Sequence, residues 1–246
     1  MFWILLLAHF IADYPLQVPW ILRAKRTLRG LSAHVAIHIV VMGILVSPTL
    51  AQVWPQVAAI AAAHFIVDAG KNAVMGWRPR WVVRSYLIDQ ALHMLVLWLA
   101  CVSIAQRAPA AVPFLPPNLA VIFSGYLVAT YVWFISERIF AHEDEAYVQE
   151  INRYGAARMA ARGLLLTIFL ALAALAFGFD VSSAERPARA FAGSFSFQAP
   201  SAQVSLALAV LPYLAGTFRR RAAITDTLVA LGIACGVTLQ ALMSGG

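Results

Sequence analysis

Histidine and aspartate recur in pairs through the N-terminal half of this 246-residue chain, and the two members of each pair stand four positions apart. Before Glu137 the chain contains five histidines, three aspartates and no glutamate, and each of these eight residues belongs to a pair. Side chains four residues apart lie on one face of an α-helix, one turn from each other, so each pair could bind a single ion. The pairs are His9 with Asp13, His34 with His38, His64 with Asp68, and Asp89 with His93.

The surroundings of the pairs favour a metal site. All four pairs lie in apolar segments, where an ionised aspartate costs about 2.5–3.5 kcal/mol on insertion scales. Few cations lie within these segments to compensate for the carboxylates, whereas divalent ions would do so, and imidazole and carboxylate are good ligands for zinc, manganese and iron. Eight ligands suit two ions. The sequence therefore predicts two divalent metal cofactors, preferably zinc or manganese with iron as an alternative, bound by His9, Asp13, His34, His38, His64, Asp68, Asp89 and His93.

Two other interpretations of these eight residues stay open at this point. The side chains could form a hydrogen-bonded polar cluster that holds a helical bundle together. They could also form a proton or ion pathway, because acidic and imidazole groups inside membrane spans often serve as relays. A single His-x-x-x-Asp pair would be a weak signal, and four such pairs are a strong one.

A repeat relates the pairs to one another. Residues 8–13 return in nearly the same form as residues 63–68, an offset of 55 positions. The same offset carries the second pair onto the fourth and aligns several basic positions. The sequence therefore predicts a tandem two-helix repeat, and parallel repeats of this kind are related by an axis along the membrane normal, where residues of both copies converge.

The composition is that of a polytopic membrane protein. Hydrophobic residues make up 62% of the chain and charged residues 12%, whereas about a quarter of the residues are charged in soluble proteins. Apolar stretches of about 20 residues, the length that crosses a bilayer as a helix, recur along the chain. We expect an all-α transmembrane bundle of eight spans, at 2–19, 32–52, 54–74, 85–106, 118–140, 158–179, 199–218 and 223–243.

Basic residues gather in alternate loops between these spans, which indicates the cytoplasmic side of the membrane. Both termini then lie outside the cytoplasm, and all four pairs fall at one level in the cytoplasmic half of the bilayer. The same distribution argues against nucleic acid as a partner, although the formal net charge is +7. Four loop arginines could also hold an anionic headgroup, namely Arg23, Arg26, Arg78 and Arg80.

The predicted organisation is a core followed by accessory spans. The core is a duplicated four-helix unit at 1–107, with repeats at about 1–52 and 56–107. The remainder, 108–246, contains the accessory C-terminal spans. Apolar residues at helical spacing predict an additional amphipathic helix at about 143–155, lying in the membrane interface.

The order of the paired residues resembles an uncharacterised family of bacterial membrane proteins, domain of unknown function 3307 (DUF3307). The resemblance covers roughly residues 1–100 and implies a multi-span protein of the bacterial inner (cytoplasmic) membrane, without implying an activity. A looser likeness connects the pattern with membrane-bound metal-dependent hydrolases, whose spans also contain His and Asp pairs. Besides the four pairs, the matching residues are Gln17, Trp20, Lys25, Lys71 and Gln90.

The chemistry of such a site favours hydrolysis. Two metal ions can activate a bridging water and clamp an oxyanion between them, which suits phosphate esters. Our leading hypothesis is a metal-dependent hydrolase that acts on a lipid-linked phosphate or similar amphiphilic ester at the cytoplasmic leaflet. Membrane lipids and an anionic amphiphilic substrate are then the expected partners. Asp13, Asp68 or Asp89 would bridge the ions or orient the water, while Lys25 and Lys71 would contact the substrate.

Two alternatives from other functional classes remain. Histidine-rich helices also suit a membrane di-iron or copper oxidoreductase, although the Glu-x-x-His motif of soluble di-iron bundles is absent. Parallel repeats with a site inside the membrane suit a divalent-metal or proton transporter. The sequence shows no Gly-x-Ser-x-Gly motif, phosphate-binding loop or dinucleotide fingerprint that would indicate other catalytic machinery.

Overall fold

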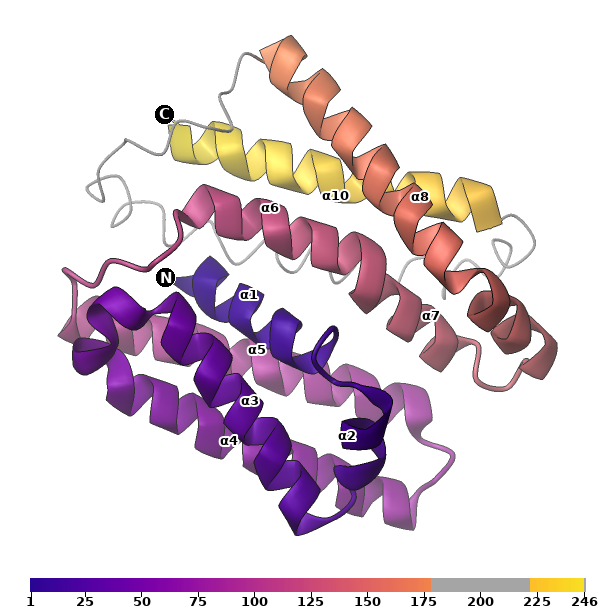
Figure 1. Cartoon of the computed structure of the whole chain (residues 1–246), viewed down its shortest axis with the longest axis horizontal. Helices are drawn as coiled ribbons and strands as arrows, with labels where there is room; N and C mark the ends of the chain where they lie inside the picture. Colours follow the sequence, from indigo (N-terminus) through magenta and orange to yellow (C-terminus); the bar gives the residue numbers. More distant parts are fainter. Residues whose placement is uncertain (178–221, 246) are drawn as a thin grey trace. The chain divides into compact units, whose positions relative to one another are not determined.

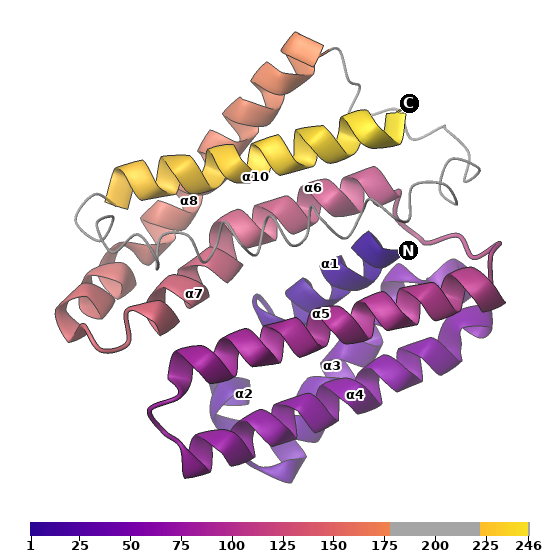
Figure 2. The same ribbon diagram turned by 180° about the vertical axis from the view of Figure 1, so that it is seen from behind.

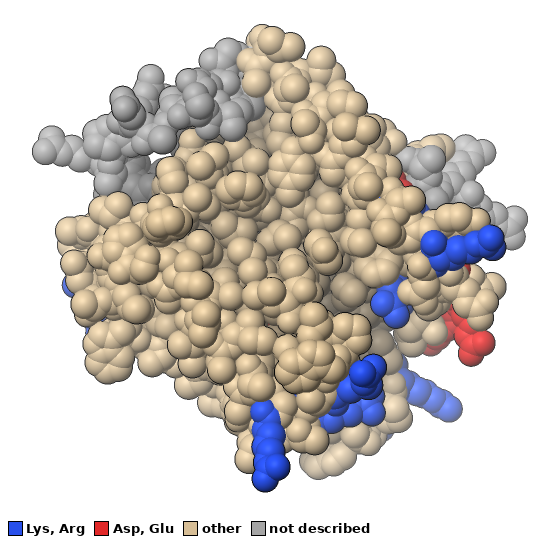
Figure 3. Space-filling model, viewed as in Figure 1, with Lys and Arg blue, Asp and Glu red and all other residues tan. Residues whose placement is uncertain are grey.

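The computed structural model describes residues 1–177 and 222–245, and every regular element among them is helical (Figures 1 and 2). Six helical segments in this part of the chain are long and apolar enough to cross a membrane. Uncharged residues cover most of the face seen in Figure 3, and charged side chains lie near its margins. The expected fold class, an all-α membrane protein with several spans, is confirmed.

The chain divides into two compact units, Met1–Ala120 and Val121–Gly246. In the first unit the long helices α4 and α5 lie side by side, α1 packs against α3 and α5, and α3 packs against α4 (Figures 1 and 2). Nearly all side chains of α1 are buried. The elements are α1 (Phe2–Asp13), α2 (Pro19–Ala24), α3 (Leu28–Leu45), the short 3-10 helix η1 (Ser47–Thr49), α4 (Leu50–Trp77) and α5 (Val82–Arg107).

The first helix is shorter than the span predicted at 2–19, because α1 ends at Asp13. Pro15 has no backbone N–H and disfavours the helical conformation of the residue before it, so the helix stops there. Pro19 then stands at the first position of α2, where its fixed φ suits a helix start. Twelve residues extend about 18 Å at 1.5 Å per residue, less than the roughly 30 Å of a bilayer core.

The other predicted spans correspond to helices with shifted ends. The second span was expected to reach residue 52, but α3 ends at Leu45 and Pro48 lies in η1 before α4 begins. The spans at 54–74, 85–106, 118–140 and 223–243 coincide with helical segments to within a few residues. The span predicted at 199–218 lies outside the described residues. Shifting the residues of α3 by the offset of 55 positions gives residues 83–100, which lie within α5. The duplication itself stays a sequence-based prediction.

The second unit is built on one long, locally deformed helix and two partners. α6 (Pro117–Leu127), which crosses the boundary between the units, continues through the π-helical segment η2 (Val128–Val132) into α7 (Trp133–Phe140). α8 (Glu145–Phe177) packs against η2 and α7, and α10 (Ala222–Gly245) packs against α8.

The segment predicted as an amphipathic helix at about 143–155 is helical from Glu145, and it is continuous with the following span in the single helix α8. Its placement in the membrane interface stays a prediction. Gly155 lies within this continuous helix and serves close packing. A Cβ atom at this position would clash with the ring of Phe134 on α7. The helix continues because no proline interrupts it and because the glycine lets the two helices approach each other.

A buried ion-pair network joins the helices of the second unit. Arg158 donates to both oxygens of Asp226 on α10, at 2.9 and 2.8 Å, and to Glu137 on α7 at 3.0 Å. Arg162, whose side chain is fully buried, donates to the same aspartate at 2.8 Å. Tyr147 donates to Glu137 at 2.7 Å. The two arginines and two acids neutralise one another, which limits the cost of burying them.

Arg162 also accounts for the π-helical segment. A π turn displaces the regular backbone hydrogen bonds of a helix. The guanidinium of Arg162 donates to the carbonyl oxygens of Ala129 and Thr130, both within this turn. The deformed segment of the long helix is therefore bound from α8 by a charged side chain.

Replacing Asp226 by asparagine should strongly destabilise the protein. The change keeps the shape but leaves two buried guanidinium groups without their shared carboxylate, and breaking a buried ion pair typically costs about 3–5 kcal/mol. We expect a clearly lowered unfolding temperature for the detergent-solubilised variant. Glu143→Gln is the control, because that side chain is 89% exposed and pairs weakly with His142. Equal unfolding temperatures for the two variants would contradict the assigned role.

Candidate metal centre

Four ligand atoms from α1, α3 and α4 gather in the first unit. Asp13 Oδ1 lies 3.0 Å from His34 Nε2 and 3.1 Å from His38 Nε2. His64 Nε2 lies 3.7 Å from the same oxygen and 3.1 Å from His34 Nε2. His34 and His38 approach each other to 3.2 Å between their Nε2 atoms. The three imidazoles are at most 1% exposed.

Hydrogen bonding alone does not account for this arrangement. A neutral imidazole has a single N–H, which can point to only one acceptor. His34 Nε2 nevertheless lies within 3.2 Å of one oxygen and of two further imidazole nitrogens. Four ligands placed tetrahedrally at 2.0–2.1 Å from a zinc ion are separated from one another by about 3.3–3.4 Å. The observed separations bracket that value, so the four atoms could hold one metal ion.

Two further groups of ligand atoms adjoin this one. The first consists of His9, Asp13 and His93, the second of His64, Asp68 and His93, and within each group the ligand atoms lie within 4.8 Å of one another. Asp13 belongs to two groups at once: its Oδ1 lies in the group with the three histidines, and its second oxygen, Oδ2, lies 3.4 Å from His9 Nε2. His93 belongs to both further groups, is 3% exposed, and neither of its ring nitrogens makes a hydrogen bond to the described residues.

Asp89 differs from the other seven predicted ligands, because it contributes to none of the three groups. Its Oδ2 accepts hydrogen bonds from Lys71 at 2.7 Å and from Gln90 at 3.1 Å. Its Oδ1 lies 3.7 Å from Nδ1 of His93. A carboxylate behind the outer nitrogen of a metal-binding imidazole orients the ring, and this role fits Asp89 better than direct ligation.

The only two lysines of the chain both reach the His/Asp cluster, by which we mean the three ligand groups together with Asp89. Lys25 Nζ lies 2.7 Å from Asp68 Oδ2, and Lys71 Nζ lies 2.7 Å from Asp89 Oδ2. The expectation that few cations are present to compensate for the aspartates is therefore wrong. Lys25 lies outside the predicted spans and reaches the cluster by its long side chain, which a count of charges within apolar segments overlooks, whereas Lys71 lies near the end of the span predicted at 54–74. Asp13 is the aspartate of the cluster that has no lysine partner.

A hydrogen-bonded chain behind Asp89 was not foreseen from the sequence. The hydroxyl of Tyr14 lies 3.1 Å from that of Tyr86 and donates to Gln90 Oε1 at 3.2 Å. Gln90 in turn donates to Asp89. Spacing could have identified Tyr86, since it precedes Asp89 by three positions and His93 by seven on α5. Tyr14 follows the end of α1, where helical spacing gives no indication.

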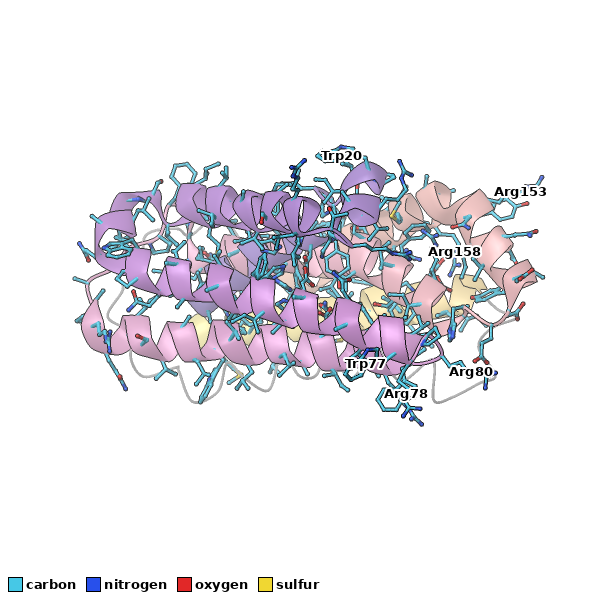
Figure 4. The ribbon with its side chains drawn as sticks, turned by 90° about the horizontal axis from the view of Figure 1, so that it is seen from below. Trp20, Trp77, Arg78, Arg80, Arg153 and Arg158 are labelled. Atoms are coloured by element: carbon cyan, nitrogen blue, oxygen red, sulfur yellow. The ribbon has the colours of Figure 1, made fainter. Side chains whose placement is uncertain are left out.

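The arginines that were expected near an anionic headgroup contribute no atom to the ligand groups of the described residues. All four are exposed, and none of them pairs with an aspartate of the cluster in the described part of the chain. In Figure 4, Arg78 and Arg80 lie beyond the end of α4 and extend away from the ribbon. Arg78 stacks over the ring of Trp81 at 5.8 Å. Contact between arginine and substrate therefore stays a prediction for Arg23, Arg26, Arg78 and Arg80.

A tight connection between α2 and α3 positions Lys25. The hydroxyl of Thr27 donates to the carbonyl of Ala24 at 2.8 Å and accepts from the Gly30 amide at 3.2 Å. Asn72 on α4 donates to the carbonyl of Lys25 at 2.9 Å. A Cβ atom on Gly30 would overlap the backbone of Ala24. Only glycine permits this close approach, which holds Lys25 facing Asp68.

Gly30→Ala should therefore destabilise the first unit, because the added methyl group must displace α2. Overpacking of this kind typically costs about 1–3 kcal/mol. Gly43→Ala is a matched control on the same helix, since a Cβ atom there meets nothing within 4 Å and alanine favours the helix. Thermal unfolding should show a lowered midpoint for Gly30→Ala and an unchanged or raised midpoint for Gly43→Ala. The reverse order would refute the assigned close approach.

A family model described as "Protein of unknown function (DUF3307)" matches residues 1–122, a region that contains the whole cluster, and confirms the family resemblance. No curated protein and no solved structure matches the chain. Nothing in these comparisons supports the looser likeness to membrane-bound metal-dependent hydrolases.

Proposed function

Because the N-terminal half of the chain belongs to DUF3307, a family of unknown function, we propose a function from the chemistry of the cluster itself. We propose that the protein is an integral-membrane metal-dependent hydrolase acting on a lipid-linked phosphate or a similar amphiphilic ester. One observation carries this proposal, namely the approach of Asp13 Oδ1 to three imidazole nitrogens that cannot all be satisfied by hydrogen bonds to one another.

The donor set indicates which ions the centre would take. Imidazole nitrogen and carboxylate oxygen without thiolate suit zinc, manganese or iron. A first ion fits the group of Asp13 with three histidines. A second fits beside it at His93, which forms one ligand group with Asp13 and His9 and another with Asp68. Such ions acidify a bound water and neutralise the charge that develops on an oxyanion during ester hydrolysis. The two oxygens of Asp13, which face different histidines, make this residue the bridge in our proposal.

The surrounding residues supply orientation and charge. Asp89 lies 3.7 Å from the Nδ1 atom of His93 and, in our proposal, orients this ring, while Gln90, itself bonded to Tyr14, donates a hydrogen bond to Asp89. Lys71, with a 32% exposed side chain, is the more accessible of the two lysines and could receive an anionic group. An amphiphilic substrate is favoured because three helices that contribute to the centre, α3, α4 and α5, are long and apolar enough to cross a membrane.

We further propose a location for the reaction. The exposed basic residues at the α1–α3 and α4–α5 connections favour the cytoplasmic side of a bacterial inner membrane for this end of the first unit. The centre would then act on the cytoplasmic leaflet, with both termini on the opposite side. Accessibility of cysteines introduced into the two connections, probed with a membrane-impermeant reagent, tests this orientation.

Purified protein should retain at least one tightly bound divalent ion, which Asp13→Asn should lose. The substitution removes the carboxylate that the first group shares with the second, while leaving its shape intact. Elemental analysis of the detergent-solubilised protein measures the ion. Asp89→Asn is the matched control, since that carboxylate lies in none of the ligand groups and the first ion should stay.

The identity of the ion separates the hydrolase from its alternatives. Tightly bound zinc or manganese favours hydrolysis, iron or copper favours redox chemistry, and a weakly bound, exchangeable ion favours transport. Full metal retention in Asp13→Asn would remove the basis of the proposed centre.

Hydrolysis can be tested directly with phosphorylated amphiphiles in mixed micelles. We expect phosphate release from phosphatidic acid or a polyprenyl diphosphate, abolished by chelation and restored by zinc or manganese. Metal ions contribute several kcal/mol to such transition states, so Asp13→Asn should be slower by more than about 100-fold. A metal-loaded protein that releases neither phosphate nor alcohol from these substrates would contradict the hydrolase proposal.

A further inference from the structure

Lys25 is paired with Asp68, a carboxylate that a second metal ion would need as a ligand. Its ammonium group lies 2.7 Å from Asp68 Oδ2. The same oxygen lies 3.4 Å from His64 Nε2 and belongs to the group formed with His93. The side chains of Lys25 and Asp68 are 13% and 4% exposed, so the ion pair is largely shielded from solvent.

The two cation positions therefore differ. The first group is built on Asp13, which has no lysine partner, and its ligand atoms face one another without a competing cation. A second ion at His93 would share Asp13 with the first ion and needs Asp68 as a carboxylate of its own, but Lys25 already neutralises the charge of Asp68. An ammonium group and a divalent ion on the same carboxylate oxygen would repel each other strongly, because little water screens them.

We propose that Lys25 and a second divalent ion compete for Asp68, so that the centre binds one ion tightly and takes the second only when an anionic group draws Lys25 away. This inference rests on the proposed function, because the phosphate group of the substrate is the anion that does so. A phosphate carries nearly two negative charges and three acceptor oxygens, and it is a stronger partner for an ammonium group than one carboxylate oxygen. Substrate binding would then complete the two-ion centre.

The second lysine provides an internal comparison. Lys71 also lies 2.7 Å from a carboxylate oxygen of the cluster. Its partner is Asp89, which contributes no atom to the ligand groups. Removing the charge of Lys71 should therefore leave the number of bound ions unchanged, whereas removing that of Lys25 should raise it.

The experiment is a metal titration of the chelator-treated, detergent-solubilised full chain, with Mn²⁺ as the probe and bound metal measured after equilibrium dialysis. We expect one tight equivalent for the unchanged protein and two for Lys25→Met, whose side chain fills similar space without the charge. The second ion should bind at least about tenfold more tightly to Lys25→Met than to the unchanged protein. Lys25→Arg, which keeps the charge, and Lys71→Met, the matched control, should each bind one.

A second arm tests the role of the anion. Methylphosphonate, a soluble phosphate analogue, should bring the unchanged protein from one equivalent of Mn²⁺ to two and should leave Lys25→Met at two. Two tight equivalents in the unchanged protein without the anion, or a single equivalent in Lys25→Met, would overturn the competition while leaving the hydrolase proposal standing. A protein that binds no ion under any condition would overturn both.

Discussion

The cost of placing ionised carboxylates among apolar helices governs the arrangement of the first unit. Three aspartates are buried or nearly so, and each must have a compensating group or destabilise the fold. Two of them receive a lysine, while Asp13 receives imidazoles from α3 and α4. The unusual chemistry of the cluster follows from that difference, because imidazole nitrogens around a lone carboxylate form a set of donors for a cation.

In the second unit, arginines rather than lysines and histidines compensate for the buried carboxylates. Arg158 and Arg162 share Asp226, and the hydroxyl of Tyr147 bonds to Glu137 in the same network. Guanidinium groups direct several N–H donors to carboxylate and carbonyl oxygens, so charges of both signs find partners within the protein. Such a network holds helices together and offers little to a ligand. In the His/Asp cluster of the first unit, by contrast, nitrogens that can each present a lone pair face one another.

Much of this arrangement could be predicted from the sequence. Spacing by four places two side chains on one helix face whatever the tertiary structure. Because apolar segments separate successive pairs along the chain, the pairs could also be expected to lie at the same level of the bundle. The different roles of Asp13, Asp68 and Asp89 could not be predicted, because they depend on which lysine stem reaches which carboxylate. Lysine reach is a tertiary property: Lys25 lies outside the apolar spans, and the pairing depends on the close approach at Gly30. The continuity of α8 was not predicted either. A glycine in a sequence can mark a break in a helix or a close contact, and the role of Gly155 follows from its contact with Phe134, which is a tertiary contact.

The prolines that end the first helix have an electrostatic consequence. A helix carries a partial negative charge at its C-terminus, where backbone carbonyl groups lack partners. Because Pro15 stops α1 directly after Asp13, the carboxylate adds its charge to this negative pole. Asp68 occupies the position that corresponds to Asp13 at the offset of 55 residues, but α4 continues to Trp77, so no such pole lies beside it. A proline that follows Asp13 and has no counterpart after Asp68 thus makes the field at Asp13 the more attractive of the two to a cation.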